Sequence, residues 1–287
     1  AIEGNVDLGS HRKDLDTIMV LTPPNLHAPI TIASMKAGKH VFCEKPLART
    51  LGEAEAMVKQ AEESGLTLKC GFNHRHHPAI QQGRQWFDDG IIGDAIFLRG
   101  RYGIGGRVGY EKEWRFNPEV VGGGHLIEQG IHEIDLARWF LGDFTEVTAF
   151  IETRFWDVSP IEDNGFALYR TSKGVVASIH SSLTQWKNIF SIELYGREGY
   201  INMEGLGGSY GTERATLGKR DFDAPFSQET VEFLGQDQSW LEEWQEFASA
   251  IKEGRQPLGN GNDGLEAMRL VFAAYEASNS RTTVRLH

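Results

Sequence analysis

The fold is decided by residues 17–72, which read TIMVLTPPNLHAPITIASMKAGKHVFCEKPLARTLGEAEAMVKQAEESGLTLKCGF. Short apolar runs occur at Thr17–Thr22, His40–Pro46 and Leu66–Phe72, and each is typical of a buried strand. The segments between them carry apolar side chains at helical spacing and end at a glycine. Strands that alternate with helices in this way form right-handed βαβ units, so the stretch predicts a parallel sheet.

The two helices of this stretch have recognisable ends. Asn25 is a suitable N-cap for a first helix that runs to Ala37, before Gly38. The second helix is expected at Leu51–Ser64, and Gly65 ends it.

The alternation stops after a helix expected at Pro78–Asp89, because the strand expected at Asp94–Arg101 has no helix directly behind it. A glycine-rich loop follows, and His125–Leu141 has the pattern of a helix. Several β-rich runs joined by turns occupy 145–203, which predicts an antiparallel sheet. The chain ends with helices expected at Ser239–Glu253 and Asp263–Ser278. The predicted fold class is therefore an α/β segment followed by an α+β domain.

Composition excludes several classes of protein. The 287 residues carry 29 Lys and Arg against 40 Asp and Glu, a net charge of −11, which argues against a nucleic-acid or membrane binder. No apolar run is long enough to span a bilayer, and the first residues do not resemble a signal peptide. Cys43 and Cys70 cannot form a disulfide framework, which favours a reducing, cytoplasmic setting.

Polar residues follow each predicted strand of the parallel sheet, where such sheets bind their ligands. They are Thr22-Pro23-Pro24-Asn25, Glu44-Lys45-Pro46 and Asn73-His74-Arg75. Lys45 is flanked by a carboxylate and fixed behind by a proline, so it is a candidate for proton transfer or for holding a substrate hydroxyl. The alternative is an ordinary surface lysine beside a turn.

A second candidate group lies on the helix expected at His125–Leu141, directly after the glycine run Gly122-Gly123-Gly124. His125, Glu128, His132 and Asp135 recur at a spacing that forms one polar stripe on an otherwise apolar helix. A carboxylate one turn from an imidazole can orient it and raise its basicity, so Glu128 and His132 are candidates for a general base. A solvated helix face and a metal site remain as alternatives.

The histidines after the third strand do not by themselves indicate a metal site. His74, His76 and His77 include potential ligands, but Arg75 lies among them, and its guanidinium opposes a bound cation. We therefore assign no metal ligands.

Four segments together resemble the Gfo/Idh/MocA oxidoreductases, the glucose-fructose oxidoreductase and inositol dehydrogenase family. They are TPPNLHAPI, AGKHVFCEKPLA, GFNHRHHPA and GGGHLIEQGIHEIDLARWFLGD, and they occur in the family's order and spacing. The resemblance implies that residues 1–74 are the remaining part of a nucleotide-binding Rossmann domain whose first part is not among these residues. It also implies that residues 75–287 form a domain whose open, mainly antiparallel sheet is covered by helices on one face, with the last helix packing back on the first domain.

The resemblance also implies an activity. The family transfers a hydride between NAD or NADP and a secondary hydroxyl or ketone of a sugar, nucleotide sugar or cyclitol. Lys45 would then bind the reacting hydroxyl, His132 would be the acid/base, and Glu128 would occupy the position usually held by aspartate. The cofactor contacts implied are Thr22, Pro23, Pro24, Asn25, His27, Glu44, Lys45 and Asn73. The substrate contacts expected are Arg75, Trp114, Arg115, His125 and Trp186, with Tyr169 and His180 as further candidates for the sugar pocket.

The sequence departs from the family pattern in two ways. The G-x-G-x-x-G turn that normally holds the pyrophosphate is absent from these residues. Either the sequence is a piece of a longer protein, or the protein has lost cofactor binding. In addition, Glu128 is one methylene longer than the usual aspartate, and His125 stands where a small or apolar residue is commoner.

Two other functions remain open at this stage. One is a non-catalytic member of the family that binds a sugar or a partner, and the other is a metal-dependent sugar isomerase or lyase. An exposed sheet face after Val147 is expected to form a homodimer or homotetramer interface, as in relatives.

Overall fold

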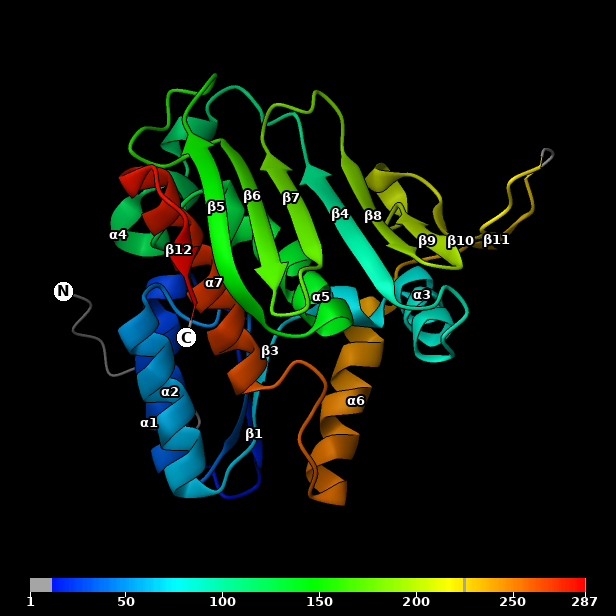
Figure 1. Ribbon diagram of the computed structural model, residues 1–287. Coiled ribbons are helices and arrows are strands. Elements are labelled where there is room, and N and C mark those ends of the chain that lie inside the picture. The colour runs from blue at the N-terminus through cyan, green and yellow to red at the C-terminus, as the bar shows by residue number, and fades with distance from the viewer. Residues whose placement is uncertain (1–11, 224–225, 287) are drawn as a thin grey trace.

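The three strands expected in the first part pair in parallel, in the order β1-β2-β3. They are β1 (Thr17–Val20), β2 (His40–Cys43) and β3 (Leu68–Cys70) in the computed structural model, which describes residues 12–223 and 226–286 (Figure 1). Each strand is shorter than predicted: β1 and β2 end before Leu21-Thr22 and Glu44-Lys45-Pro46, and β3 lacks two residues at each end. The residues after each strand form the loops at the carboxyl ends of the strands.

Helices α1 (His27–Lys36) and α2 (Leu51–Ser64) connect these strands. The predicted bounds of α2 are confirmed: Thr50 and Glu53 form a capping box, and Gly65 ends the helix with a φ of +64°. The Asn25 cap is wrong. A 3-10 turn at Pro24–Leu26 precedes α1, and Asn25 lies inside it.

The second part of the chain forms a nine-stranded sheet of order β11-β10-β9-β8-β4-β7-β6-β5-β12. All neighbouring pairs are antiparallel except β4 and β7. The strands are β4 (Ala95–Gly103), β5 (Phe144–Glu152), β6 (Asn164–Thr171), β7 (Val176–Ser182), β8 (Ile189–Gly196), β9 (Gly199–Glu204), β10 (Glu213–Lys219), β11 (Gln228–Phe233) and β12 (Val284–Arg285). The predicted fold class is thus confirmed.

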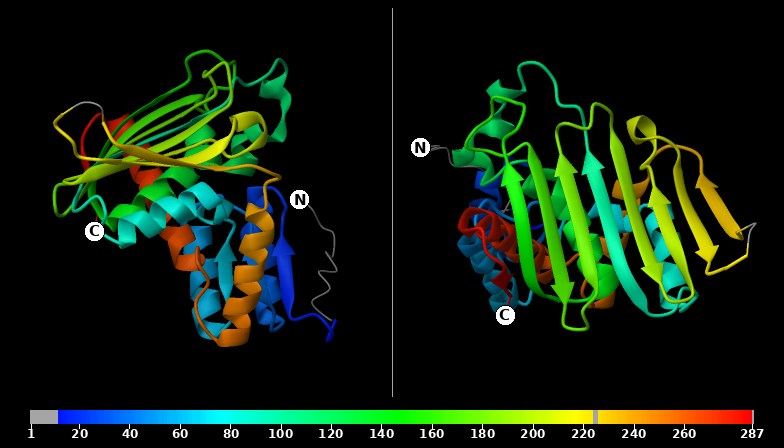
Figure 2. Two further views of the ribbon diagram at one scale, coloured as in Figure 1. Left: turned by 90° about the vertical axis from the view of Figure 1, so that its right-hand side faces the viewer. Right: turned by 45° about the horizontal axis from the view of Figure 1, so that its top comes forward.

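Helices cover only one face of this sheet (Figures 1 and 2). They are α3 (Pro78–Asp88) under β9 and β10, α5 (Ile131–Leu141) under β4 and β7, and α7 (Gly261–Ser280) under β5. A short α4 (Pro118–Val121) lies in the loop after β4. The opposite face carries exposed apolar side chains, namely Phe150, Phe166 and Leu168.

The predicted helix at His125–Leu141 is interrupted at its start. Leu126–Gly130 is a π-helical turn, and regular α-helix begins only at Ile131. A π turn holds more residues than an α turn, so side chains before Gly130 are rotated relative to those after it. Glu128 and His132 therefore do not share one stripe as the 3.6-residue spacing predicts.

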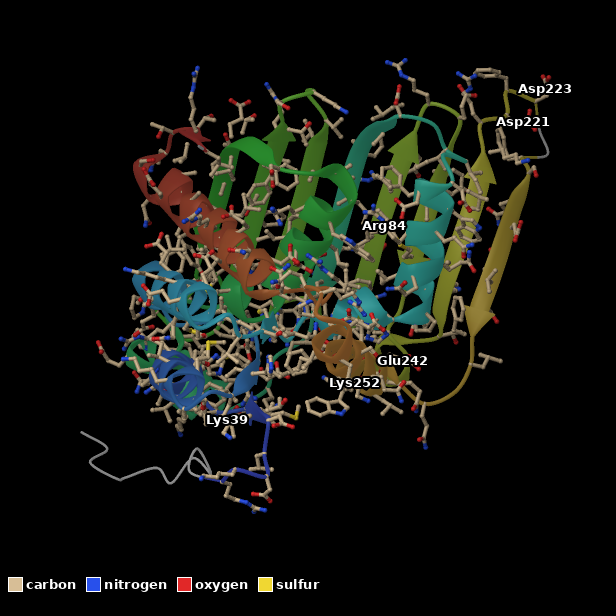
Figure 3. The ribbon with its side chains drawn as sticks, turned by 90° about the horizontal axis from the view of Figure 1, so that it is seen from below. Lys39, Arg84, Asp221, Asp223, Glu242 and Lys252 are labelled. Carbon is tan, nitrogen blue, oxygen red and sulfur yellow. The ribbon has the colours of Figure 1, made fainter. Side chains whose placement is uncertain are left out.

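The last two helices return to the small sheet. α6 (Ser239–Glu253) packs on β2 through Phe247, whose ring centroid is 5.7 Å from that of Phe42. Its Glu243 is fully buried and lies 3.0 Å from the ammonium of Lys69 on β3. Figure 3 shows α6, marked by Glu242 and Lys252, on the underside of the large sheet. This buried ion pair joins β3 of the small sheet to α6, which follows the large sheet in the chain.

Within the described residues, none of the helices combines the length and the apolar character needed to cross a bilayer.

Candidate active site

A cleft of about 420 Å³ opens where the loops after β1 and β2 meet the segment before α5. This is the carboxyl end of the parallel strands, the edge where such sheets bind ligands. Its lining consists of Leu21, Thr22, Pro23, Pro24, Glu44, Lys45, Pro46, Trp114, Arg115, Val121, Gly123, Ile127 and Glu128. The cleft therefore brings together residues from both parts of the chain.

Within the cleft, Lys45 joins the two parts. Its ammonium donates a hydrogen bond to the backbone oxygen of Glu128, on the π turn that leads into α5. The carboxylate of Glu44 accepts a hydrogen bond from the backbone N–H of Lys45 at 3.1 Å. A lysine held at both its backbone and its side chain presents a positioned positive charge at the floor of the cleft.

His27 lies beneath these loops and does not line the cleft. Its Nδ1 is 2.8 Å from the backbone oxygen of Pro46, and its Nε2 is 2.7 Å from that of Thr22. The side chain is 1% exposed. The structure thus places His27 against the backbone of the two loops, and not at the cavity where the family resemblance put it.

The side chain of Glu128 pairs with Arg115 and not with His132. Arg115 Nε lies 2.9 Å from Glu128 Oε1, and the guanidinium lies over the ring of Trp114 at 4.5 Å. Trp114 is itself 42% exposed at the mouth of the cleft. The expected carboxylate–imidazole couple is therefore replaced by an ion pair beside an exposed indole.

His132 lies on α5, is 2% exposed and does not line the cleft; it is stacked on His74, with ring centroids 3.7 Å apart. Burial lowers the pKa of His132 well below its ordinary value, and the charges of Lys45 and its histidine neighbours act in the same direction. The expectation that Glu128 raises its basicity is wrong, because that carboxylate faces Arg115. His132 is held as a neutral ring.

Two further buried imidazoles near Lys45, those of His74 and His125, are also held neutral. Burial also lowers the pKa of His74 well below its ordinary value and that of His125 to about 3, and Lys45 contributes to both shifts. Within the described part of the chain, three of their ring nitrogens are buried without a hydrogen-bond partner, namely His74 Nε2 and both nitrogens of His125. The charge of Lys45 thus lowers the pKa of His74, His125 and His132 alike. His125 itself is 1% exposed and does not line the cleft.

The structure places Arg75 in the core and not at the substrate. Its guanidinium pairs with Asp135 at 2.6 Å and with Asp263 at 3.2 Å, and its side chain is 2% exposed. A buried guanidinium needs such partners. Asn73 is used internally as well: its amide donates to Ser239 Oγ at 2.9 Å and accepts from His74 Nδ1.

Three aromatic candidates lie outside the cleft. Trp186 is 62% exposed in the loop after β7 and packs edge-on against Phe155. Tyr169 on β6 is fully buried, and its hydroxyl donates to the backbone oxygen of Leu270 at 3.1 Å. His180 stacks on Phe166 on the open face of the sheet. Alternation along β6 and β7 sends these two side chains to opposite faces.

The sequence analysis did not predict the role of Glu162, whose carboxylate holds the backbone just before α5. The buried carboxylate of Glu162 accepts hydrogen bonds from the backbone N–H groups of Gly124 and Leu126 at 2.8 and 3.0 Å, and from the hydroxyl of Tyr275 at 2.9 Å. A Cβ on Gly124 would lie 2.2 Å from the backbone oxygen of Glu162. The glycine run was the one signal in the sequence for this close approach.

The residues at the cleft fit the nicotinamide half of the cofactor that the resemblance implies. Pro23, Pro24 and Pro46 give a rigid apolar wall beside the polar Glu44. Thr22 Oγ1 is a buried hydroxyl with no hydrogen-bond partner within residues 12–223 and 226–286. A planar ring with a polar substituent matches this combination of flat apolar walls and an unsatisfied hydroxyl. Over the same residues, no three His, Cys, Asp or Glu side chains are grouped so as to hold a metal ion.

Two family models match the chain. The model of the oxidoreductase family with an NAD-binding Rossmann fold matches residues 5–72, and that of the GFO/IDH/MocA C-terminal domain matches residues 80–202. The chain belongs to the Gfo/Idh/MocA oxidoreductase family. The resemblance read from the four sequence segments is thereby confirmed.

Individual relatives of the chain are named as sugar and cyclitol dehydrogenases. Levoglucosan dehydrogenase of Pseudarthrobacter phenanthrenivorans is 29% identical over 66% of this chain and 55% of its own length. Myo-inositol 2-dehydrogenase of Thermotoga maritima is 26% identical over 95% of this chain and 80% of its own length. A solved levoglucosan dehydrogenase in complex with NADH and levoglucosan superposes with a TM-score of 0.89 at 25% identity, covering 97% of this chain and 82% of that one. The chain thus spans only 55% of the first of these relatives, and about four fifths of the other two.

Proposed function

We propose that the protein is an NAD- or NADP-dependent oxidoreductase that acts on a secondary hydroxyl, or the corresponding ketone, of a sugar or cyclitol. The observation that carries the proposal is the meeting of Lys45 with the π turn before α5 in one cleft. Relatives named as dehydrogenases of levoglucosan and of myo-inositol support the substrate class.

Lys45, which lines the cleft, and His132, which lies on α5 outside the lining, divide the work on the substrate. The ammonium of Lys45 binds the reacting hydroxyl oxygen and stabilises the negative charge that develops on it. The imidazole of His132, kept neutral by burial, accepts the hydroxyl proton during oxidation and returns it during reduction. Both groups act on the same oxygen atom of the substrate.

The remaining cleft residues bind the sugar. Trp114 offers an exposed indole on which the C–H face of a sugar ring can stack. Glu128 and Arg115 present an acceptor and a donor side by side, which suits a pair of neighbouring hydroxyl groups.

The cofactor, when bound, accepts or supplies the hydride. Thr22, Pro23, Pro24 and Glu44 would hold its nicotinamide and ribose at the carboxyl ends of β1 and β2. The group that holds the pyrophosphate and the residue that selects NAD or NADP lie outside the residues at this cleft.

Binding of the four nicotinamide nucleotides tests the proposal. The protein with its natural N-terminus is titrated with NAD⁺, NADH, NADP⁺ and NADPH while nicotinamide fluorescence and thermal unfolding are followed. Saturable binding of at least one nucleotide is expected, followed by turnover with a panel of sugars and cyclitols. Absence of binding by all four would contradict the proposal, and turnover that a chelator abolishes and a divalent metal restores would assign a metal enzyme instead.

We also propose that the open face of the large sheet pairs with a second copy of the chain. Phe166 is 50% exposed and Leu168 51% exposed on β6, and Phe150 is 69% exposed opposite Phe166 on β5. Contiguous apolar side chains on a sheet face that no helix covers are typical of a protein interface.

A further inference from the structure

The imidazole of His27 joins the two loops that form the floor of the cleft. Nε2 lies 2.7 Å from the backbone oxygen of Thr22, in the loop after β1, and Nδ1 lies 2.8 Å from that of Pro46, in the loop after β2. These are the two loops that the proposed function assigns to the nicotinamide and to Lys45. Among the described residues that line the cleft, none bridges both loops in this way.

The site of His27 is rigid and dry. The side chain is 1% exposed, and it belongs to the first residue of α1, immediately after the 3-10 turn Pro24–Leu26. Its backbone is thus fixed to one loop, and its ring reaches across to the other. The spacing between the two loops is set by the width of one imidazole ring.

The two contacts use the two ring nitrogens separately. A carbonyl oxygen accepts a hydrogen bond only from a ring N–H, so the protonated ring donates to both loops and the neutral ring to one. Burial lowers the pKa of His27, while the two carbonyl groups and the charge of Glu44 act in the opposite direction. Only the doubly protonated ring donates to both carbonyl oxygens, at 2.7 and 2.8 Å, so the two contacts act as separate hydrogen bonds below the pKa of the ring. In the neutral ring, the nitrogen without a hydrogen holds its loop by packing alone.

We propose that His27 is a positioning residue that sets the cofactor loop and the lysine loop independently, through Nε2 and Nδ1. Nε2 fixes Thr22 and hence the wall against which the nicotinamide lies. Nδ1 fixes Pro46 and hence the neighbouring Lys45, whose ammonium reaches Glu128. This role rests on the proposed function and extends it to a residue that touches neither cofactor nor substrate.

Two conservative substitutions separate the two contacts. The amide nitrogen of asparagine lies as many bonds from Cβ as Nδ1 does, and that of glutamine as many as Nε2. His27→Asn therefore retains the bond to Pro46 and loses the bond to Thr22, whereas His27→Gln does the reverse. We expect His27→Asn to weaken nucleotide affinity about tenfold with kcat nearly unchanged, the effect of one hydrogen bond.

The opposite split is expected for His27→Gln, in which kcat falls about tenfold while nucleotide affinity is retained. His40→Asn, at the amino end of β2, is the matched control and should leave both quantities within about twofold of the wild type, as expected away from the site. Equal losses of affinity and kcat in both His27 variants would overturn the proposal, because a merely structural histidine has no reason to separate them.

Hydrogen exchange of the nucleotide-free protein provides a readout without turnover. Exchange should accelerate at residues 21–26 in His27→Asn and at residues 44–48 in His27→Gln. Identical exchange in both variants would contradict separate clamping even if no nucleotide bound, so failure of this role is distinguishable from failure of the proposed function. Should a variant not fold, the wild-type ring decides: its N–H must exchange slowly with solvent, and rapid exchange would overturn the proposal.

Discussion

Lys45 is the side chain on which the proposed chemistry depends at the scale of single residues. Its ammonium has one backbone acceptor, Glu128, 83 positions away in the chain. A substrate hydroxyl that enters the cleft can share or take that position, and the ammonium then stabilises the developing alkoxide.

Lys45→Ala should lower kcat by a factor on the order of 10² to 10³, the cost of removing one donor to a developing oxyanion. Nucleotide affinity should stay within a few fold, because the ammonium acts on the substrate oxygen. Steady-state kinetics and fluorescence titration measure the two quantities. Lys36→Ala, at the end of α1, is the matched control. Loss of affinity and turnover together would assign Lys45 to cofactor binding.

His132→Asn should remove the acid limb of the pH profile of kcat/KM. His132 must be unprotonated to accept the hydroxyl proton, and burial lowers its pKa below the ordinary value of 6.5. Wild-type activity in the oxidation direction should therefore fall only as the pH drops below that value. The variant should be about 10² to 10⁴ times slower and flat over this range. An unchanged profile would remove His132 from the mechanism.

At the scale of secondary-structure elements, the helix α5 carries His132, which stacks on His74, and Glu133, which faces β4 of the large sheet. Glu133 is fully buried, and a Cβ on Gly100 of β4 would lie 2.8 Å from its Oε1. Both of its carboxylate oxygens lack a hydrogen-bond partner within the described residues. Burial raises the pKa of Glu133 well above its ordinary value, so the folded protein holds this carboxyl protonated.

Glu133→Gln should change how the free energy of unfolding depends on pH. In the wild type the folded-state pKa is raised above the ordinary 4.5, so the contribution of Glu133 to stability is complete below pH 4.5 and is lost as the pH rises. Relative to the variant, the wild type should lose up to about 1.4 kcal/mol per pH unit above that value. Urea unfolding between pH 5 and 8 measures the difference, and parallel curves for the two proteins would contradict a protonated Glu133.

The sequence predicts elements well where local signals and the final environment agree. The bounds of α2 and α6 are confirmed, because a capping box begins α2 and a glycine follows each of the two helices. Strands β10 and β11 were not predicted, since β10 carries three charged residues and β11 is mostly exposed; both gain regularity from their pairing in the sheet. The π turn was also missed, because the apolar pattern of α5 continues through it.

Some residues of the candidate site could be predicted from the sequence and others could not. Lys45, Glu44 and the Thr22-Pro23-Pro24 loop were predictable because strand ends meet at one edge of a parallel sheet. The location of Arg75 was not, since its partners Asp135 and Asp263 lie 60 and 188 positions away. Only the folded chain shows that these carboxylates enclose the guanidinium.

At the scale of the whole molecule, the large sheet presents one face to helices and the other to solvent (Figure 2). The apolar residues Phe150, Phe166 and Leu168 lie on the solvent face. A second copy placed there would leave the cleft accessible, because the cleft lies on the side of the small sheet.

Phe166→Glu should therefore reduce the mass of the protein in sedimentation or light scattering to that of a monomer. A buried, unpaired carboxylate at the centre of an interface is strongly unfavourable. Phe155→Glu, an exposed aromatic residue in a loop outside the sheet, is the control. A mass unaffected by Phe166→Glu would place the interface elsewhere or show that the protein is a monomer.

The most direct test of the central claim is a single turnover with the full-length protein, oxidised nicotinamide nucleotide and a sugar or cyclitol deuterated at the reacting carbon. The near-ultraviolet absorbance of reduced nicotinamide should appear, more slowly for the deuterated substrate, and should nearly vanish in Lys45→Ala while nucleotide still binds. No reduced nicotinamide from any substrate of this class, or equal rates in wild type and Lys45→Ala, would contradict hydride transfer at this cleft.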